Sequence, residues 1–430
     1  MRLLFTSVQI LCFVSVYTIG WAQNNETLSM RTVGQHSAYY YQAATRVADA
    51  AQYTLQPGFL FTSLSLRIDA DESFAGAYVV CQQDTLYLSA DDHGPVGADY
   101  RQANLVILPR PTEKIIFYPA TIRGEISFSF FNALGEKKSL NRSSRTEQHS
   151  NRARTCEEPP LILPDEWRAG LPEPTYSRSA TRVSHVIIHH SATYNDLTDY
   201  ENVVRNIYLF HTQSNGWSDI GYNYLVAPDG TIFAGRSAGN QSVARDNIQG
   251  AHFCGQNSGT MGVCLLGNYN TAVPSDVAIN SIVQVVGWKI SKEELNPFGE
   301  KTHPTNASLG TIAGHRNGCA TECPGDNLYA RLDEIRAKVA NHVATDCAED
   351  ATVVLVYPIP VTDVMTVTWP DSLRIEVATL YDMVGRNWNI GLTPERPNQI
   401  TWDTRNLATG VYVVHLSGLG WEARRKILVQ

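Results

Sequence analysis

Short apolar runs with a period of two dominate the first third of the chain. LSLRI (64–68) and ISFSF (126–130) alternate apolar with polar side chains, and turn-rich stretches such as DDHGPVG (91–97) separate runs of this kind. Such alternation is typical of strands that bury one face. We therefore predict an all-β sandwich domain over residues 37–135.

The pattern changes after a polar segment. NRSSRTEQHSNRART (141–155) has no aliphatic or aromatic side chain except Ala153, so we predict a linker over residues 136–156. Beyond it, VSHVIIHH (183–190) is typical of a buried strand, and apolar residues three or four apart indicate helices over 200–210, 278–289 and 328–343. Strands that alternate with helices predict an α/β domain over residues 157–347, with a mixed sheet flanked by helices.

The last region, residues 352–430, returns to strand patterns. MTVTW, IEVATLYD, GVYVVHL and RKILVQ are rich in β-branched and aromatic residues and lie between Gly, Pro and Asn turns. We predict a second small sandwich here. The fold class is thus multidomain, with a central α/β domain between two all-β domains.

The N-terminal segment has the pattern of a targeting signal. An apolar stretch from Leu3 to Ala22 ends in small residues, and the next positive charge is Arg31. This pattern predicts a cleaved signal peptide over residues 1–22. A membrane anchor is the alternative, since twenty residues can span a bilayer. We expect a monomer without a membrane span in the mature form. The net charge of -8 and the pI of about 5.8 argue against nucleic acid as a partner.

One loop-like stretch contains a pair of metal-ligating residue types. GHRNGCATECPG (314–325) separates His315 from Cys323 by eight residues, which on a helix would be about 12 Å along the axis. Its glycines and proline favour a loop that brings the two together, and imidazole with thiolate suggests zinc. VIIHHSAT offers a third ligand at a strand end. Because a strand alternates faces, only one of His189 and His190 can join; both could also be purely structural.

Four motifs carry a family resemblance across residues 161–343. VIIHHSAT, GWSDIGYNYLVAPDGTIFAGR, QGAHFCGQNSGTMGVCLLGNY and GHRNGCATECPG occur in the order and spacing of the peptidoglycan recognition protein and phage lysozyme-type family of N-acetylmuramoyl-L-alanine amidases. The resemblance implies Zn²⁺ bound by His189, His315 and Cys323. It also implies hydrolysis of the amide between the muramic acid lactyl group and the L-alanine of the stem peptide, in peptidoglycan or muropeptides.

The same resemblance suggests roles for further residues. Tyr222 matches the tyrosine that faces the metal, where it would polarise the bound water or the oxyanion; without the motif it would be a core aromatic. Thr321 stands where the phage enzymes have lysine and recognition-protein amidases commonly have threonine, so it offers a hydroxyl but no positive charge. We expect His252, Asn257 and His190 to line the substrate groove; bracing of a loop is the alternative for His252 and Asn257.

The cysteines leave several disulfide pairings open. Cys12 is lost with the signal, and if Cys323 binds metal, six cysteines remain, which allow 15 pairings. Export would place them in an oxidising compartment, where disulfides form. Cys156 and Cys347 bracket the central domain as a staple would, whereas Cys81 and Cys264 lie in apolar runs that also suit buried thiols.

The tail carries a resemblance of its own. YPIPVTDVMTV, LYDMVGR, WDTRNLATGVYVVHL and RRKILVQ resemble the C-terminal sorting domain of type IX secretion in certain Gram-negative bacteria, with Ile359 in place of the usual asparagine. This implies the type IX secretion machinery as a partner. The protein would be exported to the periplasm and then across the outer membrane, to be secreted or attached to the cell surface.

Two other functions compete with a secreted zinc amidase. A non-catalytic peptidoglycan-binding module would have the same fold, but such members typically lack the zinc cysteine, and Cys323 is present. A periplasmic recycling amidase would not need the sorting tail. The sequence also contains no H-E-x-x-H and no Walker motif. We therefore predict the secreted zinc amidase.

Overall fold

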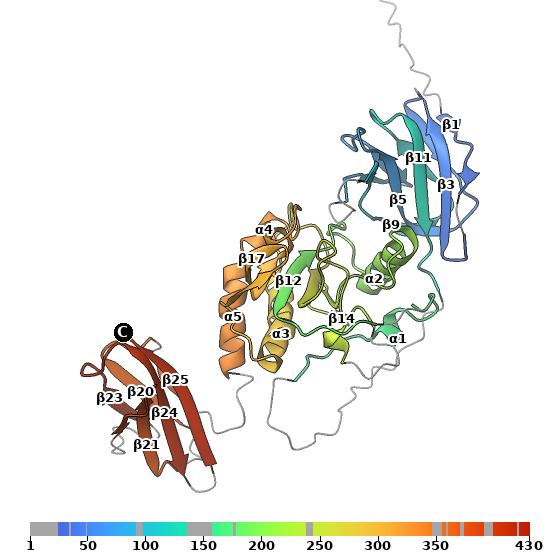
Figure 1. The fold of residues 1–430 in the computed structure, drawn as a ribbon. Helices are drawn as coiled ribbons and strands as arrows, with labels where there is room; N and C mark the ends of the chain where they lie inside the picture. The colour runs from blue at the N-terminus through green and yellow to red at the C-terminus, as the bar shows by residue number, and fades with distance from the viewer. Residues whose placement is uncertain are drawn as a thin grey trace, which may run out of the picture. The chain divides into compact units, whose positions relative to one another are not determined.

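The computed structural model divides into two compact units (Figure 1). One comprises Met1–Gly135 with Arg205–Gly216, and the other comprises Glu136–Val204 with Trp217–Gln430. The structure describes residues 25–430 except 34–35, 49, 92–97, 136–156, 175–177, 238–243, 346–354, 358–359, 370–373, 391–398 and 419–420. The predicted signal peptide, the predicted linker, Cys156 and Cys347 lie outside the described residues.

The first unit contains two β-sheets. One has the order β1 (Asn25–Thr27), β4 (Gln52–Leu55), β10 (Ile115–Tyr118), β6 (Tyr78–Cys81) and β7 (Asp84–Tyr87). The other has the order β2 (Arg31–Thr32), β3 (Tyr40–Val47), β11 (Gly124–Phe131), β5 (Phe61–Asp69) and β8 (Tyr100–Gln102), with β9 (Val106–Thr112) also paired to β5. The sheets meet where the rings of Phe117 and Phe128 lie 5.4 Å apart. The strands predicted at LSLRI and ISFSF are confirmed as the neighbours β5 and β11.

The segment Arg205–Gly216 packs against the second of these sheets. Asn206 Oδ1 accepts hydrogen bonds from the hydroxyls of Thr62 (2.7 Å) and Ser63 (2.6 Å). The fully buried Arg205 donates from Nε to the carbonyl oxygen of Ala133 at 2.8 Å. Apolar and polar side chains alternate along β5, as in a strand with one face in water. Ser63 is nevertheless buried, because residues of the segment Arg205–Gly216 cover it.

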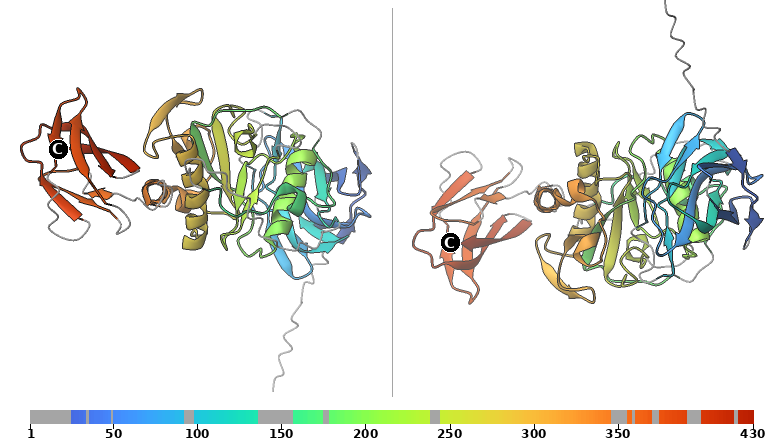
Figure 2. Two further views of the ribbon diagram at one scale, coloured as in Figure 1. Left: turned by 90° about the horizontal axis from the view of Figure 1, so that it is seen from below. Right: turned by 90° about the horizontal axis from the view of Figure 1, so that it is seen from above.

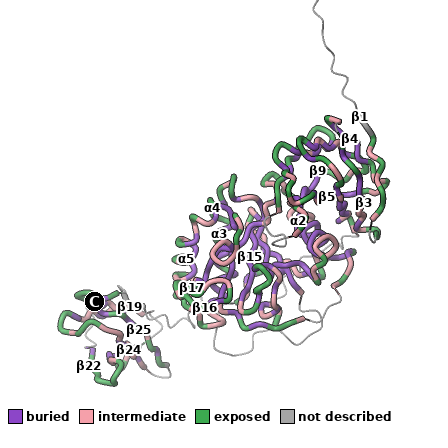
Figure 3. Tube along the Cα trace, turned by 45° about the horizontal axis from the view of Figure 1, so that its top comes forward, coloured by how far each residue is buried: buried purple, intermediate pink, exposed green. Residues whose placement is uncertain are grey.

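The second unit is built on a mixed five-stranded sheet. Its order is β14 (Ile232–Ala234), β13 (Tyr224–Val226), β15 (Thr260–Leu265), β12 (His185–His190) and β18 (Ile312–Gly314). All pairings are parallel except β13 with β14, which flank a turn at Pro228, Asp229 and Gly230. Strands β12 and β15 are buried along their whole length, and the tube at β15 is purple in Figure 3. The prediction of a central α/β domain with a mixed sheet is confirmed.

Helices α3 (Asp276–Lys292) and α5 (Leu332–Thr345) pack on the sheet of the second unit. The same unit contains α1 (Pro164–Trp167), α4 (Asp326–Tyr329), the short 3-10 turns η2 (Arg245–Asn247) and η3 (His315–Asn317), and a hairpin of β16 (Glu300–His303) and β17 (Asn306–Gly310). Helix α2 (Tyr200–Leu209) begins in the second unit, but from Arg205 on it belongs to the first unit, as does the π-helix η1 (Phe210–Ser214) that continues it. The helices predicted from apolar spacing are therefore confirmed. No helix among the described residues is long and apolar enough to cross a bilayer.

The alternation of β12 decides which side of the sheet each histidine faces. Val186 and Ile188 join the hydrophobic core formed with α3 and α5. Ile187 instead packs with Phe253 and Ala313 in a separate cluster. Because side chains alternate along a strand, His189 shares the side of Ile187 and faces away from α3 and α5.

The C-terminal region consists of two antiparallel sheets, drawn in red in Figure 2. One has the order β19 (Leu355–Tyr357), β20 (Val364–Thr368) and β23 (Gln399–Asp403); the other has the order β22 (Asn387–Asn389), β21 (Val377–Asp382), β24 (Gly410–Gly418) and β25 (Trp421–Val429). Val367, Leu380, Ile400, Val414 and Ile427 lie in one buried cluster, so the region has a core of its own.

Candidate metal centre

Three potential metal ligands converge at the carboxyl end of β12. His189 comes from that strand, His315 follows β18 directly, and Cys323 ends the loop after η3. One ligand atom from each lies within 4.8 Å of the others, and all three residues are buried. The Sγ of Cys323 lies 3.6 Å from Nδ1 of His189, and the rings of His189 and His315 are 4.5 Å apart.

The loop between His315 and Cys323 folds back on itself, as its glycines and proline predict. The backbone N–H of Arg316 donates to the carbonyl oxygen of Cys323 at 3.0 Å, which joins the two ends of the loop. The guanidinium of Arg316 also forms an ion pair with Asp326 at 2.6 Å. These contacts bring side chains eight residues apart to one point.

His252 contacts Nε2 of His189, whereas Nδ1 of the same ring lies near Cys323. Nε2 of His189 lies 3.0 Å from Nδ1 of His252, and Nε2 of His252 lies 3.3 Å from the hydroxyl of Thr260. A Cβ at Gly250 would lie 2.4 Å from the His252 ring, and one at Gly262 would lie 2.6 Å from it. Glycine is thus required at both positions to make room for this imidazole.

Asn257 and Thr321 brace the loops that carry the other residues. Asn257 Oδ1 accepts the backbone N–H groups of His252 (2.7 Å) and Phe253 (2.9 Å). The hydroxyl of Thr321 accepts the backbone N–H of Cys323 at 3.0 Å. Asn257 therefore has the bracing contacts that the sequence left as an alternative; contact of His252 or Asn257 with substrate stays a prediction.

His190 and His189 have different surroundings, as strand alternation requires. The side chain of His190 is 1% exposed, and its Nδ1 accepts the backbone N–H of Tyr269 at 3.2 Å. Its own backbone N–H donates to Sγ of Cys323 at 3.3 Å. His190 therefore contacts the centre through its backbone, and a role of its ring in substrate binding stays a prediction.

Tyr222 lies beside His189, with ring centroids 5.3 Å apart. A buried network holds the segment before it: Arg236 donates from Nε to the carbonyl oxygen of Ile220 at 3.0 Å, and Asp219 accepts the N–H of Ser237 at 3.1 Å. Burial raises the pKa of the Asp219 carboxyl above its usual value, against the opposing effect of that hydrogen bond. Tyr222 is thus fixed next to the candidate ligands.

A second cysteine and histidine group adjoins the first. Cys254, His315 and Cys319 also place their ligand atoms within 4.8 Å, but Cys254 and Cys319 form a disulfide. This bond ties the loop after His252 to the loop between His315 and Cys323. The sequence left this pairing open, although both cysteines lie within four residues of a site histidine. Cys81 and Cys264 are buried free thiols, which confirms that alternative.

The fold and the site define an α/β protein with a buried histidine and cysteine cluster at the end of its central strand. A family profile described as N-acetylmuramoyl-L-alanine amidase matches residues 179–326. Peptidoglycan-recognition protein SC2 of Drosophila melanogaster is 31% identical over 174 residues, which are 40% of this chain and 84% of that protein. The chain therefore belongs to the family of peptidoglycan recognition proteins and N-acetylmuramoyl-L-alanine amidases.

Two mammalian proteins are also similar to this chain. Peptidoglycan recognition protein 1 of Mus musculus is 31% identical over 174 residues, 39% of this chain and 84% of that protein. An N-acetylmuramoyl-L-alanine amidase of Homo sapiens is 31% identical over 137 residues, 32% of this chain and 21% of that protein.

The tail matches a second profile, described as a secretion system C-terminal sorting domain, over residues 355–430. The predicted type IX sorting domain is therefore confirmed. It implies that the chain is secreted.

Proposed function

We propose that this chain is a secreted, zinc-dependent N-acetylmuramoyl-L-alanine amidase. It hydrolyses the amide between the lactyl group of muramic acid and the L-alanine of the peptidoglycan stem peptide. The observation that carries the proposal is the convergence of His189, His315 and Cys323 in one buried cluster with a free thiol. Membership of the amidase family supports the same reaction.

The donor set fits zinc. Bond lengths of about 2.0–2.1 Å to nitrogen and 2.3 Å to sulfur imply a nitrogen to sulfur distance of about 3.5 Å across a tetrahedral ion. The 3.6 Å between Nδ1 of His189 and Sγ of Cys323 agrees with this value. His189, His315 and Cys323 would hold the ion, which would act as a Lewis acid and lower the pKa of a water bound to it.

His252 is assigned as a positioning residue for His189. Metal-binding histidines usually engage their second ring nitrogen in a hydrogen bond, which fixes the tautomer and the ring orientation. The 3.0 Å contact between His189 Nε2 and His252 Nδ1 has this form and leaves Nδ1 of His189 for the metal. The N–H of His190 stabilises the thiolate of Cys323, since a hydrogen bond to the charged form favours it.

Tyr222 and Thr321 supply polar hydrogens to the reacting carbonyl. In the hydrolysis, water adds to the carbonyl carbon, negative charge develops on the carbonyl oxygen, the C–N bond breaks and the leaving amine takes a proton. Tyr222, beside His189, is assigned to the oxyanion or to the attacking water. The Thr321 hydroxyl, next to Cys323, is assigned as a second donor.

The substrate is peptidoglycan or muropeptides outside the cell. The sorting domain supports transfer from the periplasm across the outer membrane by the type IX machinery. The proposed organisation keeps a signal peptide over 1–22, the N-terminal β-domain over 37–135, the linker over 136–156, the amidase domain over 157–347 and the sorting domain over 352–430.

Mass spectrometry of purified peptidoglycan after incubation with the full-length protein tests the reaction. We expect intact stem peptides with a free N-terminal L-alanine, and glycan strands without peptides. Binding to peptidoglycan without peptide release would instead identify a recognition module, and released disaccharides would identify a glycosidase.

A further inference from the structure

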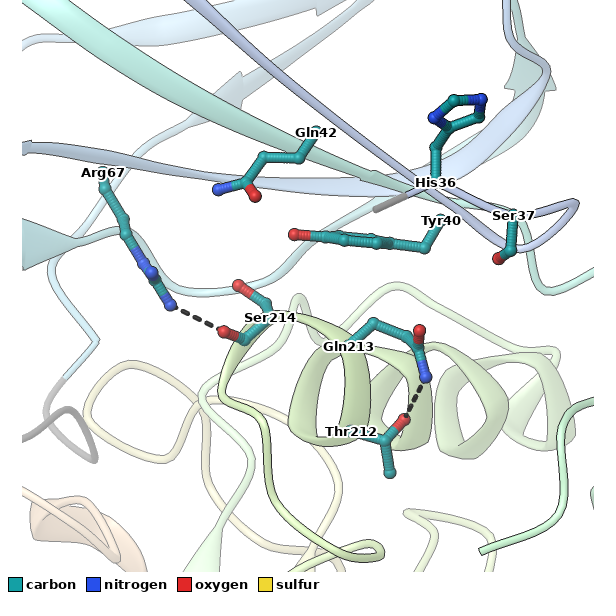
Figure 4. A pocket seen from close by; sticks show the side chains of 8 residues that line it. All are labelled: His36, Ser37, Tyr40, Gln42, Arg67, Thr212, Gln213 and Ser214. Carbon is teal, nitrogen blue, oxygen red and sulfur yellow. Dashed lines mark hydrogen bonds between the residues drawn. The ribbon is translucent and has the colours of Figure 1, made fainter. Parts of the chain in front are cut away.

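A cavity of about 360 Å³ lies in the first unit, which contains all of its lining residues (Figure 4). Tyr40 and Gln42 project into it from β3 and Arg67 from β5. Thr212–Ser214 of η1 forms the facing wall. The volume is at the lower end of the range for small-molecule sites, which suits a sugar of one or two rings.

The polar groups of the cavity are already held in place. Gln42 donates from Nε2 to the hydroxyl of Ser127 at 3.0 Å. Gln213 donates from Nε2 to the hydroxyl of Thr212 at 3.3 Å. Both amides therefore have a fixed orientation before any ligand binds, which lowers the entropy cost of binding.

Arg67 provides a fixed positive charge at one end of the cavity. Its Nε donates to Gln102 Oε1 and its Nη2 to the carbonyl oxygen of Ser214, both at 2.7 Å. The guanidinium also stacks over the ring of Tyr100 at 4.6 Å. Two of five N–H donors are used in these bonds, and no carboxylate of the described residues lies within salt-bridge distance of Arg67. The remaining donors suit a carboxylate from a ligand.

Tyr40 adds an aromatic wall with a neutral hydroxyl. Its ring stacks on Phe131 at 5.5 Å, and its hydroxyl lies 3.3 Å from that of Ser129. Burial raises the pKa of Tyr40, and the nearby charge of Arg67 lowers it to a lesser degree. The phenol therefore keeps its proton at neutral pH and does not oppose an anion beside Arg67.

We propose that this cavity, the Arg67 pocket, binds a sugar that carries a carboxylate. Arg67 receives the carboxylate, and Tyr40, Gln42 and Gln213 bind the ring substituents. The choice of sugar rests on the proposed function. Hydrolysis of the muramoyl amide leaves a carboxylate on each lactyl group, whereas the uncut strand has a neutral amide there. The Arg67 pocket thus binds N-acetylmuramic acid units of the cut glycan.

Calorimetric titration of the full-length protein with N-acetylmuramic acid tests the pocket. The methyl ester of its lactyl carboxylate and N-acetylglucosamine are the ligand controls, because both lack the charge. We expect the ester, or the substitution Arg67→Gln, to weaken binding about tenfold or more, the scale of a lost charge-assisted hydrogen bond. Arg101→Gln on neighbouring β8 is the matched control, since Arg101 is exposed and donates to the Ala70 carbonyl oxygen at 2.7 Å. It should bind as the wild type does.

Two further variants keep the test decisive. Gln42→Leu leaves the hydrogen bonds of Arg67 intact and should weaken binding severalfold even if Arg67→Gln fails to fold. Cys323→Ser should bind the sugar unchanged. Binding that is lost in Cys323→Ser but kept in Arg67→Gln and Gln42→Leu would assign the sugar to the metal centre and overturn the proposal. Arg67-dependent binding by a protein that releases no stem peptide would refute the amidase alone.

Discussion

Two cysteine and histidine clusters share His315, yet they differ in burial and in the state of sulfur. In the first, His189, His315 and Cys323 are buried and the sulfur is a free thiol. In the second, Cys254 is exposed and its sulfur is bonded to that of Cys319. In each cluster, the candidate ligand atoms lie within 4.8 Å of one another.

The difference teaches that proximity alone does not define a metal centre. Zinc binds the thiolate form of cysteine, and a sulfur in a disulfide has no negative charge to offer. Oxidation therefore removes the second cluster from competition for His315. The Cys254–Cys319 disulfide instead links the two loops that carry His252 and Cys323.

The largest effect is expected when the first cluster loses its sulfur. Cys323→Ser should reduce peptide release to background, because serine is a far poorer zinc ligand of similar shape. Metal analysis should give about one zinc per wild-type chain and much less in the variant. Cys81→Ser, at a buried free thiol of the first unit, is the control and should retain both zinc and activity. Full activity of zinc-free Cys323→Ser protein would refute the mechanism.

A comparable loss is expected at only one of the two adjacent histidines. His189→Ala should abolish activity and zinc binding, whereas His190→Ala should retain zinc, because the two rings face opposite sides of β12. Zinc content and peptide release of both variants check this. The reverse result would mean that the wrong face of the strand was chosen.

A smaller effect is expected at Tyr222. Tyr222→Phe keeps the ring beside His189 and removes the hydroxyl, so turnover should fall about 100-fold or more while zinc is retained. Turnover at the wild-type rate would make Tyr222 a purely structural aromatic.

The second cluster should matter for stability more than for chemistry. The double substitution of Cys254 and Cys319 by serine opens a loop of 65 residues, which lowers the free energy of unfolding by up to about 4 kcal/mol. Zinc should stay at one per chain, and activity should change only a few fold. Thermal melting and metal analysis measure both. If mild reduction of the wild type raised its zinc content to two per chain, the contrast between the clusters would fail.

The smallest effect on the purified enzyme is expected from removal of the tail. Both clusters lie between His189 and Cys323, and the C-terminal region has its own core. Deletion of residues 352–430 should leave zinc content and amidase activity nearly unchanged. In the native cell it should retain the enzyme in the periplasm, which fractionation and blotting detect. Wild-type amounts of truncated enzyme in the medium would contradict the role of the tail.

Local patterns in the sequence predict most of the elements around the site. The apolar run of β12, the Pro-Asp-Gly turn and the spacing in α3 each depend on neighbouring residues only, so they can be interpreted without a structure. The same holds for the loop of His315 and Cys323, whose glycines and proline lie within twelve residues.

Contacts between distant residues could not be predicted in this way. The bond from His252 to His189 spans 63 positions and depends on the glycines that make room for the ring. The pairing of Cys254 with Cys319 was one of 15 possibilities. The burial of Ser63 depends on Asn206, 143 residues away. The alternation of apolar and polar side chains within β5 therefore could not predict it.

Helix α2 limits how this protein can be divided. Its first residues belong to the second unit, but its Arg205 and Asn206, together with Phe210 of the following η1, are covered by the N-terminal sheets. A fragment that begins at residue 157 would bring a guanidinium, an amide and a phenyl ring into water without their partners. Domain exchange among family members would therefore have to transfer the N-terminal strands together with the motifs of the site, or replace this helical surface.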